Sequence, residues 1–406
     1  MPNKKREVGD REPHCSRREF LSGLLVGTAA LTTGINVLAR QVPRENKERK
    51  LGVALLGLGR YATGELGPAL RQTKLCYLAG VVTGHPEKGE KWAAEYDLKK
   101  TNIYSYENLD RIADNKEIDI VYVVTPPGLH PEFAIRAARA GKHVISEKPM
   151  ATSVADCDRM IAACKSAGVQ LGIGYRLHYD PYHLEMERLG RETELGPFTK
   201  ISGGFAYVMR EREQRIDKKL AGGGPLMDLG IYIVHGACMA TGSTPIYVRA
   251  KEEPKLNPEL FNEVEETISF TLEFPHGESC EGLASFNRGA NQFHLEGKKG
   301  WMDLKSAFSY RGLTGATSRG PLNYPVTNQQ AAQMDAFADC VLTGRPTRVP
   351  GELGRRDITI LMAIYEAART GKRVKVERAK DVSMNHQARK LPPLRPVETR
   401  ATSRGV

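Results

Sequence analysis

Several features are absent from this sequence, and each absence excludes a class of protein. The seven cysteines include no pair at metal-ligand spacing, which argues against a zinc ribbon or finger, so no metal site is predicted. The net charge is +11, but no basic stripe is interleaved with aromatic residues, so we expect no nucleic-acid partner. No internal repeat occurs, and no apolar run reaches the ~20 residues of a membrane span.

The cysteines are expected to be small buried hydrophobic residues, because most have apolar neighbours in the sequence. Cys157 and Cys164 share one face of a predicted helix, but two turns separate them by about 10 Å of helical rise. That distance is too long for a disulfide. The other cysteines are Cys15, Cys76, Cys238, Cys280 and Cys340.

Residues 1–39 are expected to be a targeting segment. The adjacent Arg17 and Arg18 precede an uncharged run, rich in small residues, from Leu24 to Ala39, and the pattern resembles a twin-arginine export signal. We therefore expect the twin-arginine translocation machinery as a partner, a periplasmic location and no stable membrane insertion after cleavage. An uncleaved N-terminal anchor is the alternative. Residues 40–50 are predicted to be a polar linker, and residues 378–406 a disordered tail.

Residues 51–172 are predicted to form an α/β dinucleotide-binding Rossmann domain. The apolar strand 51–56 runs into the turn GLGRYA, a G-x-G-x-x-A pattern before a helix. Gly57 permits the tight turn, and Gly59 lets the backbone approach a pyrophosphate at the helix N-terminus. The cofactor residues expected in this turn are Gly57, Gly59, Arg60 and Tyr61.

The second strand, from Leu78 to Val82, ends in a segment that favours NADP over NAD. NAD-binding domains usually place Asp or Glu here to bind the ribose 2′-hydroxyl. This chain has Thr83 and, five residues on, Lys88, and a neutral donor with a cation suits a 2′-phosphate. The alternative is that Thr83 only caps the turn and that Lys88 is a solvated surface residue.

Residues 121–150 read as strand, turn, helix and strand, and they end in Glu147, Lys148 and a proline. The second of these strands brings Lys148 to the carboxyl edge of a parallel sheet, where open α/β sheets bind their ligands. A solvated surface lysine is the alternative. Glu147 is assigned to the cofactor site with Lys148, and the nicotinamide side of the crevice is expected to be lined by Thr125, Pro126 and His130.

A second domain, residues 173–377, is predicted to be α+β, with a large and mostly antiparallel open sheet. It begins with GYRLHYDP, a polar and aromatic cluster past a strand end that suits a polyhydroxylated ligand, although a surface loop would also fit. Helices are predicted near 181–191, 328–343 and 353–370. Strands are predicted at 198–208, 246–250, 265–274, 278–287, 291–297, 300–304 and 308–312. The expected contacts with such a ligand are Tyr175, Arg176, His178, Tyr179 and His235, and Arg176 is also assigned to the cofactor site.

A triple-glycine turn at 222–224 precedes another polar cluster. The helix that follows places Asp228, Tyr232 and His235 at positions i, i+4 and i+7, which lie on one face. Such a stripe also occurs on solvated helix faces. Three such groups beside a turn that permits close backbone approach favour a catalytic role for Asp228 and Tyr232.

Four motifs together resemble the Gfo/Idh/MocA oxidoreductase family: GLGRYA, EKP at 147–149, GYRLHYDP and GGGPLMDLGIY at 222–232. The resemblance covers roughly residues 51–377, and with the export signal it looks most like the glucose–fructose oxidoreductase branch. It matches Lys148 to the family's active-site lysine, and Asp228 with Tyr232 to its D-x-x-x-[Y/H] pair. Thr83 and Lys88 stand where that branch places its NADP-phosphate contacts. His235 departs from the Asn or Asp expected there, which leaves the sugar contacts open.

The resemblance implies hydride transfer between NADP and a CH–OH group of a sugar. A free tyrosine, with a pKa of about 10, is a poor base at neutral pH. A lysine cation within a few Å favours the phenolate. We therefore predict Tyr232 as the acid/base, Lys148 as its electrostatic partner and Asp228 as a hydrogen-bonding group that orients the sugar or the tyrosine.

Export would separate the enzyme from a pool of free NADP(H), so the cofactor is expected to stay bound. One aldose would then be oxidised and a second sugar reduced in ping-pong fashion. The alternatives are a redox-assisted glycoside hydrolase that uses NAD, and a non-catalytic protein that senses NADP or sugar. A homodimer or homotetramer is expected to form through the C-terminal sheet.

Overall fold

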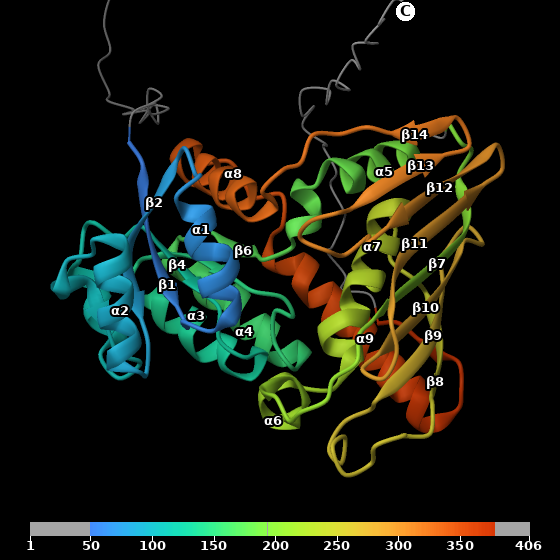
Figure 1. Ribbon diagram of the computed structural model, residues 1–406, viewed down its shortest axis with the longest axis horizontal. Helices are drawn as coiled ribbons and strands as arrows, with labels where there is room; N and C mark the ends of the chain where they lie inside the picture. The colour runs from blue at the N-terminus through green and yellow to red at the C-terminus, as the bar shows by residue number, and fades with distance from the viewer. Residues whose placement is uncertain (1–48, 193, 378–406) are drawn as a thin grey trace, which may run out of the picture. The chain divides into compact units, whose positions relative to one another are not determined.

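The computed structural model describes residues 49–192 and 194–377. The predicted signal segment, nearly all of the linker and the predicted tail lie outside these residues. The described residues contain two sheets and belong to one compact unit (Figure 1). The proposed boundary between two domains at residues 172 and 173 therefore stays a prediction.

The first sheet is six-stranded and parallel, and its strand order is β3-β2-β1-β4-β5-β6. The order reverses between β1 and β4, so the turns after these two strands meet at the switch point where open α/β sheets bind ligands. All residues of β1 are buried, as a continuous apolar strand between two helix layers requires. The strands are β1 (Leu51–Leu56), β2 (Cys76–Val82), β3 (Ile103–Tyr104), β4 (Ile120–Val123), β5 (His143–Ser146) and β6 (Leu171–Ile173).

Helices cover both faces of this sheet. The helix after β1 contains a π-helical segment, η2 (Ala62–Leu66), and continues as α1 (Gly67–Leu70). One covering helix, α8 (Gln329–Thr343), comes from the far end of the chain, and its Met334 and Phe337 share a core with Leu55. This return of the chain joins the two predicted domains. The remaining helices here are α2 (Pro86–Tyr96), α3 (His130–Arg139), α4 (Val154–Ala167) and the short 3₁₀ segments η3 (Lys100–Asn102), η4 (Leu109–Asp114) and η5 (Pro127–Leu129).

The second sheet has nine strands in the order β14-β13-β12-β11-β7-β10-β9-β8-β15, and only β7 and β10 pair in parallel. Helices α5, α7 and α9 lie on one side of it (Figure 1). The strands are β7 (Phe198–Ala206), β8 (Tyr247–Glu252), β9 (Thr267–Glu273), β10 (Ser279–Ser285), β11 (Ala290–Gly297), β12 (Gly300–Lys305), β13 (Thr314–Thr317), β14 (Gly320–Leu322) and β15 (Val374–Lys375). The helical segments are η6 (Arg176–Tyr179), α5 (Pro181–Glu192), η7 (Gln214–Ile216), α6 (Lys218–Ala221), η8 (Leu226–Gly230), α7 (Ile231–Thr241) and α9 (Gly351–Thr370).

The strand predicted at 308–312 is wrong. These residues form a loop, and the next strand, β13, begins at Thr314. The reason is that side chains take the backbone groups of Phe308: Asn291 accepts from its N–H at 2.8 Å, and Arg176 donates to its carbonyl. The Phe308 ring is 1% exposed and fills the core beneath the loop. A strand ladder would have needed the same N–H and C=O groups.

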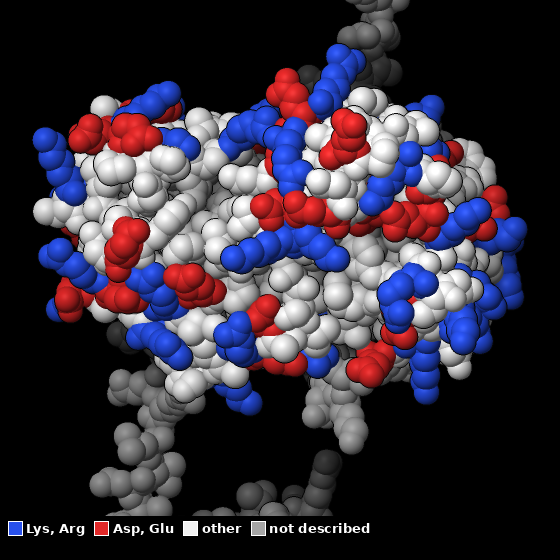
Figure 2. All heavy atoms as spheres, turned by 90° about the horizontal axis from the view of Figure 1, so that it is seen from below, with Lys and Arg blue, Asp and Glu red and all other residues white. Residues whose placement is uncertain are grey.

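The cysteine prediction is confirmed for five of the described residues, because Cys76, Cys157, Cys164, Cys238 and Cys280 are all buried free thiols. Within the described chain, no helix is long and apolar enough to cross a membrane. On the side that carries α6, basic and acidic side chains of the described residues are interspersed (Figure 2).

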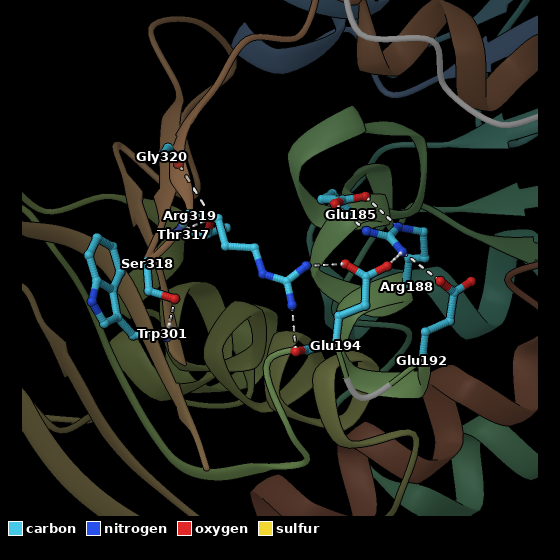
Figure 3. Close-up of polar contacts among 9 residues, drawn as sticks. All are labelled: Glu185, Arg188, Glu192, Glu194, Trp301, Thr317, Ser318, Arg319 and Gly320. Atoms are coloured by element: carbon cyan, nitrogen blue, oxygen red, sulfur yellow. Dashed lines mark hydrogen bonds and ion pairs between the residues drawn. The ribbon is translucent and has the colours of Figure 1, made fainter. Parts of the chain in front are cut away.

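The hairpin of β13 and β14 is fastened to the end of α5 by a charged network (Figure 3). Arg319, in the hairpin turn, donates to the Glu194 carbonyl at 2.8 Å and to its carboxylate at 3.1 Å. Glu194 is shared with Arg188, which also pairs with Glu185 and Glu192. The network fixes the outer edge of the second sheet.

Candidate active site

The turn after β1 has an open approach to its backbone. Gly57 has a φ of +101°, where a side chain would be strained, and its N–H donates to the Val82 carbonyl at 3.0 Å. A Cβ at Gly59 would meet no described atom within 4 Å, so space remains in front of this backbone. A helix begins directly afterwards, at Arg60. Open space at a glycine before a helix N-terminus fits a dinucleotide pyrophosphate.

At the end of β2, Thr83 is buried and Lys88 is exposed. The Thr83 hydroxyl oxygen accepts from the His85 N–H at 3.1 Å, so the residue does cap the turn. Its own proton stays available, because this hydrogen bond uses only a lone pair. Lys88 lies in the first turn of α2, beside Glu87, which pairs with His85 at 3.3 Å. A 2′-phosphate site made by Thr83 and Lys88 therefore stays a prediction.

The turn after β4 places Thr125 and Pro126 at the switch point, but it turns His130 away from it. The His130 ring is 0% exposed, and its nitrogens lie 2.7 Å from the Thr125 carbonyl and 3.0 Å from the Pro149 carbonyl. We correct the expectation that His130 lines the crevice, because its ring holds two backbone segments together from behind. The Thr125 hydroxyl is buried without a partner among the described residues.

Glu147 lies beneath the strand end that carries Lys148. Its carboxylate accepts from the Tyr122 hydroxyl at 2.6 Å and from the Lys148 N–H at 3.1 Å. A Cβ at Gly174 would lie 2.5 Å from this carboxylate, so the strand end can pack only against a glycine. Burial raises the pKa of Glu147. Glu147 therefore supports the backbone that positions Lys148.

Lys148 reaches across to the second sheet's helices. Its Nζ donates to the Asp228 carbonyl at 3.0 Å and to its carboxylate at 3.2 Å. The same atom lies 4.6 Å from the centroid of the Tyr232 ring. Burial works against the ammonium, but Tyr232, Asp228 and Glu147 together hold the pKa of Lys148 above its ordinary value. Lys148 is therefore a cation at neutral pH.

The triple-glycine turn seats the helix that carries Asp228 and Tyr232. A Cβ at Gly223 would lie 1.8 Å from the Tyr365 hydroxyl, and one at Gly224 would lie 2.3 Å from the Glu265 carbonyl oxygen. The Glu265 carboxylate accepts from the N–H groups of Gly224 and Leu226, both at 3.0 Å. The glycines are needed because these groups pack directly against the backbone.

Asp228 bridges two cations. One carboxylate oxygen accepts from Lys148, and the other lies 3.1 Å from the Nε of Arg215. Burial acts to raise the pKa of Asp228, but the charges of Lys148 and Arg215 prevail and hold that pKa below its ordinary value. Asp228 is therefore a carboxylate at neutral pH.

Tyr232 lies between two cations and is 9% exposed. Lys148 is on one side, and the Arg176 guanidinium carbon lies 5.0 Å from the ring centroid. The same guanidinium lies 4.5 Å from the Tyr310 ring, which in turn is 5.7 Å from the Tyr61 ring of the first turn. Two rings, one from each half of the fold, thus lie beside the Tyr232 phenol.

His235 and two of the four predicted ligand contacts in GYRLHYDP, Tyr175 and His178, contact one another in the buried interior. His235 is 1% exposed; its Nδ1 lies 2.5 Å from the Asp357 carboxylate and its Nε2 lies 2.9 Å from His178. Tyr175 stacks on His235 at 3.8 Å between ring centroids, and Tyr179 is half-buried. Asp357 of α9 thus lies in a buried network with His235, His178 and Tyr175, and a sugar contact by these residues or by Tyr179 stays a prediction. Arg176 alone of the four reaches Tyr232.

Two residues of the site were not found from the sequence. Arg215 lies in a charged stretch whose composition is that of any surface loop, and Tyr310 lies in the segment taken for a strand. Neither has a periodic or motif signal. Within the described ranges, no group of three His, Cys, Asp or Glu residues could hold a metal ion.

Comparisons with known proteins agree with this geometry. Residues 51–175 match the family described as "Oxidoreductase family, NAD-binding Rossmann fold", and residues 183–303 match the "GFO/IDH/MocA C-terminal domain". The D-xylose 1-dehydrogenase [NADP(+)] of Haloarcula marismortui is 27% identical over 80% of this chain and 92% of its own length. The D-xylose 1-dehydrogenase (NADP(+)) 2 of Haloferax volcanii is 30% identical over 67% of this chain and 84% of its own length.

Among solved structures, the aldose-aldose oxidoreductase of Caulobacter crescentus, complexed with glycerol, is 42% identical. It superposes with a TM-score of 0.78 and covers 80% of this chain and 100% of its own. The two regions that match the family models together extend over more than half of the chain. The chain therefore belongs to the Gfo/Idh/MocA oxidoreductase family.

Proposed function

We propose that the protein is an NADP-dependent oxidoreductase that transfers a hydride between NADP(H) and a CH–OH or carbonyl carbon of a sugar. The observation that carries this proposal is the position of the Tyr232 phenol between Lys148 and Arg176, at the carboxyl edge of the dinucleotide-binding sheet. The names of the similar xylose dehydrogenases and of the aldose-aldose oxidoreductase support a sugar as the substrate.

The residues of the site divide the proton chemistry between them. In the direction of oxidation, the Tyr232 phenolate accepts the hydroxyl proton of the sugar, and in reduction the phenol returns it to the carbonyl oxygen. The Lys148 ammonium and the Arg176 guanidinium lie 4.6 Å and 5.0 Å from the centroid of the Tyr232 ring, where their positive charges offset the negative charge left on the phenol when its proton is absent. Asp228 holds Lys148 in place through its carboxylate and carbonyl oxygens. When bound, NADP supplies the hydride acceptor.

The cofactor residues of the proposal are those of the first turn and the strand ends. Gly57, Gly59 and the helix N-terminus would hold the pyrophosphate, and Thr83 with Lys88 the 2′-phosphate. Thr125, Pro126 and Tyr61 lie around the switch point on the nicotinamide side. Arg60 belongs to this group by its place in the turn, although in this structure it pairs with Glu213 at 2.5 Å.

Export and recycling of the cofactor in place are the finer part of the proposal. The twin-arginine pattern in residues 1–39 supports export, and the name of the Caulobacter relative supports two aldoses as the substrate pair. The test is to purify the mature protein, extract its nucleotide and follow the nicotinamide absorbance while single sugars and pairs of sugars are added. We expect the purified protein to contain one NADP(H) per chain. One aldose should change the nicotinamide absorbance, and a second sugar should reverse that change. Turnover that requires millimolar free cofactor would rule out recycling.

A homo-oligomer through the second sheet is also proposed. The side of this sheet away from α7 carries an open hollow lined by Ser202, Gly204, Ser269, Thr271 and Glu281, among other residues. Small side chains on central strands allow two copies to approach closely. Light scattering on the purified protein tests this: a monomer at micromolar concentration would contradict it.

A further inference from the structure

Residues 207–222, which follow β7, form a segment that we call the strap. The strap contacts both turns at the switch point of the first sheet. Glu213 pairs with Arg60 in the first turn at 2.5 Å. The Lys219 carbonyl oxygen packs against Gly128 so closely that a Cβ there would lie 2.5 Å from it. The strap therefore joins the second sheet to both cofactor-side turns.

Arg215, at the centre of the strap, is the residue that reaches the catalytic helix. Its Nε lies 3.1 Å from one oxygen of Asp228, and its NH1 lies 3.1 Å from the Glu213 carboxylate. The other oxygen of Asp228 accepts from Lys148. Side chains of alternating charge are thus in contact in the order Arg60, Glu213, Arg215, Asp228 and Lys148.

This arrangement shares the charge of Asp228 between two cations. If Arg215 were absent, the whole carboxylate charge would act on Lys148, whose Nζ would be drawn toward Asp228 and away from the Tyr232 ring. The Lys148 ammonium cannot serve a carboxylate and a phenolate equally well, because each competes for the same three N–H donors. Arg215 reduces that competition by holding the second oxygen.

We infer that Arg215 is a positioning residue: it holds Asp228 so that Lys148 stays available to Tyr232. The inference deepens the proposed function and rests on it for the kinetic part of its test. Arg215 acts through Asp228 and is not assigned a contact with substrate or cofactor.

The direction of the electrostatic effect follows from the groups that face Asp228. These are Lys148 of the first sheet, Arg215 and Tyr207 of the strap, and Tyr310 of the loop after β12. Arg215 helps to lower the pKa of Asp228, and its positive charge also acts to lower the pKa of Lys148. Removal of Arg215 should therefore raise both pKa values.

The test compares Arg215→Gln with a matched control, Arg212→Gln. Arg212 lies on the same strap, and its side chain is 48% exposed, similar to the 45% of Arg215. Unlike Arg215, it pairs with Glu263 and donates to Asn262. The first readout is the rate of reductive methylation of Lys148, followed by mass spectrometry on the full-length protein. We expect labelling of Lys148 to slow roughly two- to fivefold in Arg215→Gln, the range for a partly exposed ion pair, and to be unchanged in Arg212→Gln.

The second readout is kinetic. In Arg215→Gln, kcat should fall with little change in the KM for sugar, and the acidic limb of the pH–rate profile should move to higher pH. Arg215→Lys should restore part of both effects, because it returns the charge. Unchanged labelling in Arg215→Gln, or an equal change in Arg212→Gln, overturns the inference. If the wild-type protein oxidises no sugar, the proposed function fails, and the labelling comparison still decides the role of Arg215.

Discussion

The Nζ of Lys148 lies 4.6 Å from the centroid of the Tyr232 ring, although the two residues are far apart in the sequence. Lys148 follows a parallel strand, and Tyr232 lies on a helix fixed by the packed glycines at 222–224. Their contact makes a phenol beside a cation, which is the arrangement that a tyrosine needs to act as a base near neutral pH.

Replacing Tyr232 by Phe should remove the proton acceptor and leave the packing intact. We expect kcat to fall by about 10²–10⁴, the usual contribution of general acid–base catalysis, with unchanged NADPH affinity. The measurement combines sugar-dependent absorbance change with a fluorescence titration of NADPH. A variant that keeps full turnover would remove Tyr232 from the mechanism. A wild-type protein that only binds sugar would point to a sensor, and one that cleaves aryl glycosides to a hydrolase.

The two glycines of the first turn should respond differently to alanine. Gly57→Ala places a side chain at a φ of +101° and 3.0 Å from the Val124 backbone, so it should destabilise the fold by about 1–3 kcal/mol. Gly59→Ala meets no described atom within 4 Å, so stability should be unchanged, while NADPH affinity falls by about tenfold or more. Thermal unfolding and NADPH fluorescence separate the two effects. Equal destabilisation by both substitutions would contradict the assignment of Gly59 to the pyrophosphate.

The preference for NADP should depend on Lys88. In Lys88→Ala the affinity for NADPH should fall by about tenfold, because one charge-assisted phosphate contact is lost, and the affinity for NADH should be unchanged. Lys74→Ala is the control, since Lys74 is also exposed but lies before β2, at the opposite edge of the sheet. Equal losses for both nucleotides would show that Lys88 does not read the 2′-phosphate.

The parts of the site that depend on residues close together in the sequence could be predicted. The buried strands of the first sheet, the Gly57 turn, the strand end at Lys148 and the helix of Asp228 and Tyr232 follow from apolar runs, turn residues and helical spacing. The direction in which the His235 side chain points could not be predicted in this way, because the ring contacts Asp357, which is 122 residues away in the sequence. The loop at Phe308 depends in the same way on Arg176, 132 residues earlier. Long-range polar partners override local periodicity in both cases.

A substitution of His235 tests whether this residue contacts the sugar or only supports the fold. In His235→Ala the buried Asp357 carboxylate loses a hydrogen-bond partner but keeps Arg356, which should lower the free energy of unfolding by about 1–3 kcal/mol. The KM for sugar should stay within about twofold if His235 serves the fold alone, because its ring is buried between Asp357 and His178. Denaturant unfolding and initial rates measure the two quantities. A large increase in KM with little loss of stability would restore His235 as a sugar contact.

The acid stability of the fold should report the ionisation of Asp228. Its pKa is held below the ordinary value by Lys148 and Arg215, so its stabilising contribution is present above the unfolded pKa of about 3.9 and is lost as the pH falls through the lower folded pKa. Asp228→Asn removes that contribution. The variant should therefore be less stable than the wild type by about 1–3 kcal/mol at pH 7, the cost of leaving buried polar partners unmatched.

On acidification this difference should shrink, because protonation makes the wild-type side chain resemble the neutral amide. Urea unfolding of both proteins between pH 7 and pH 3 measures it, with Asp303→Asn as a control. Asp303 is a partly exposed carboxylate on β12 that contacts His294, away from Lys148. A difference between wild type and Asp228→Asn that is the same at every pH would mean that Asp228 is not an ionised bridge between Lys148 and Arg215, and that its packing alone stabilises the helix.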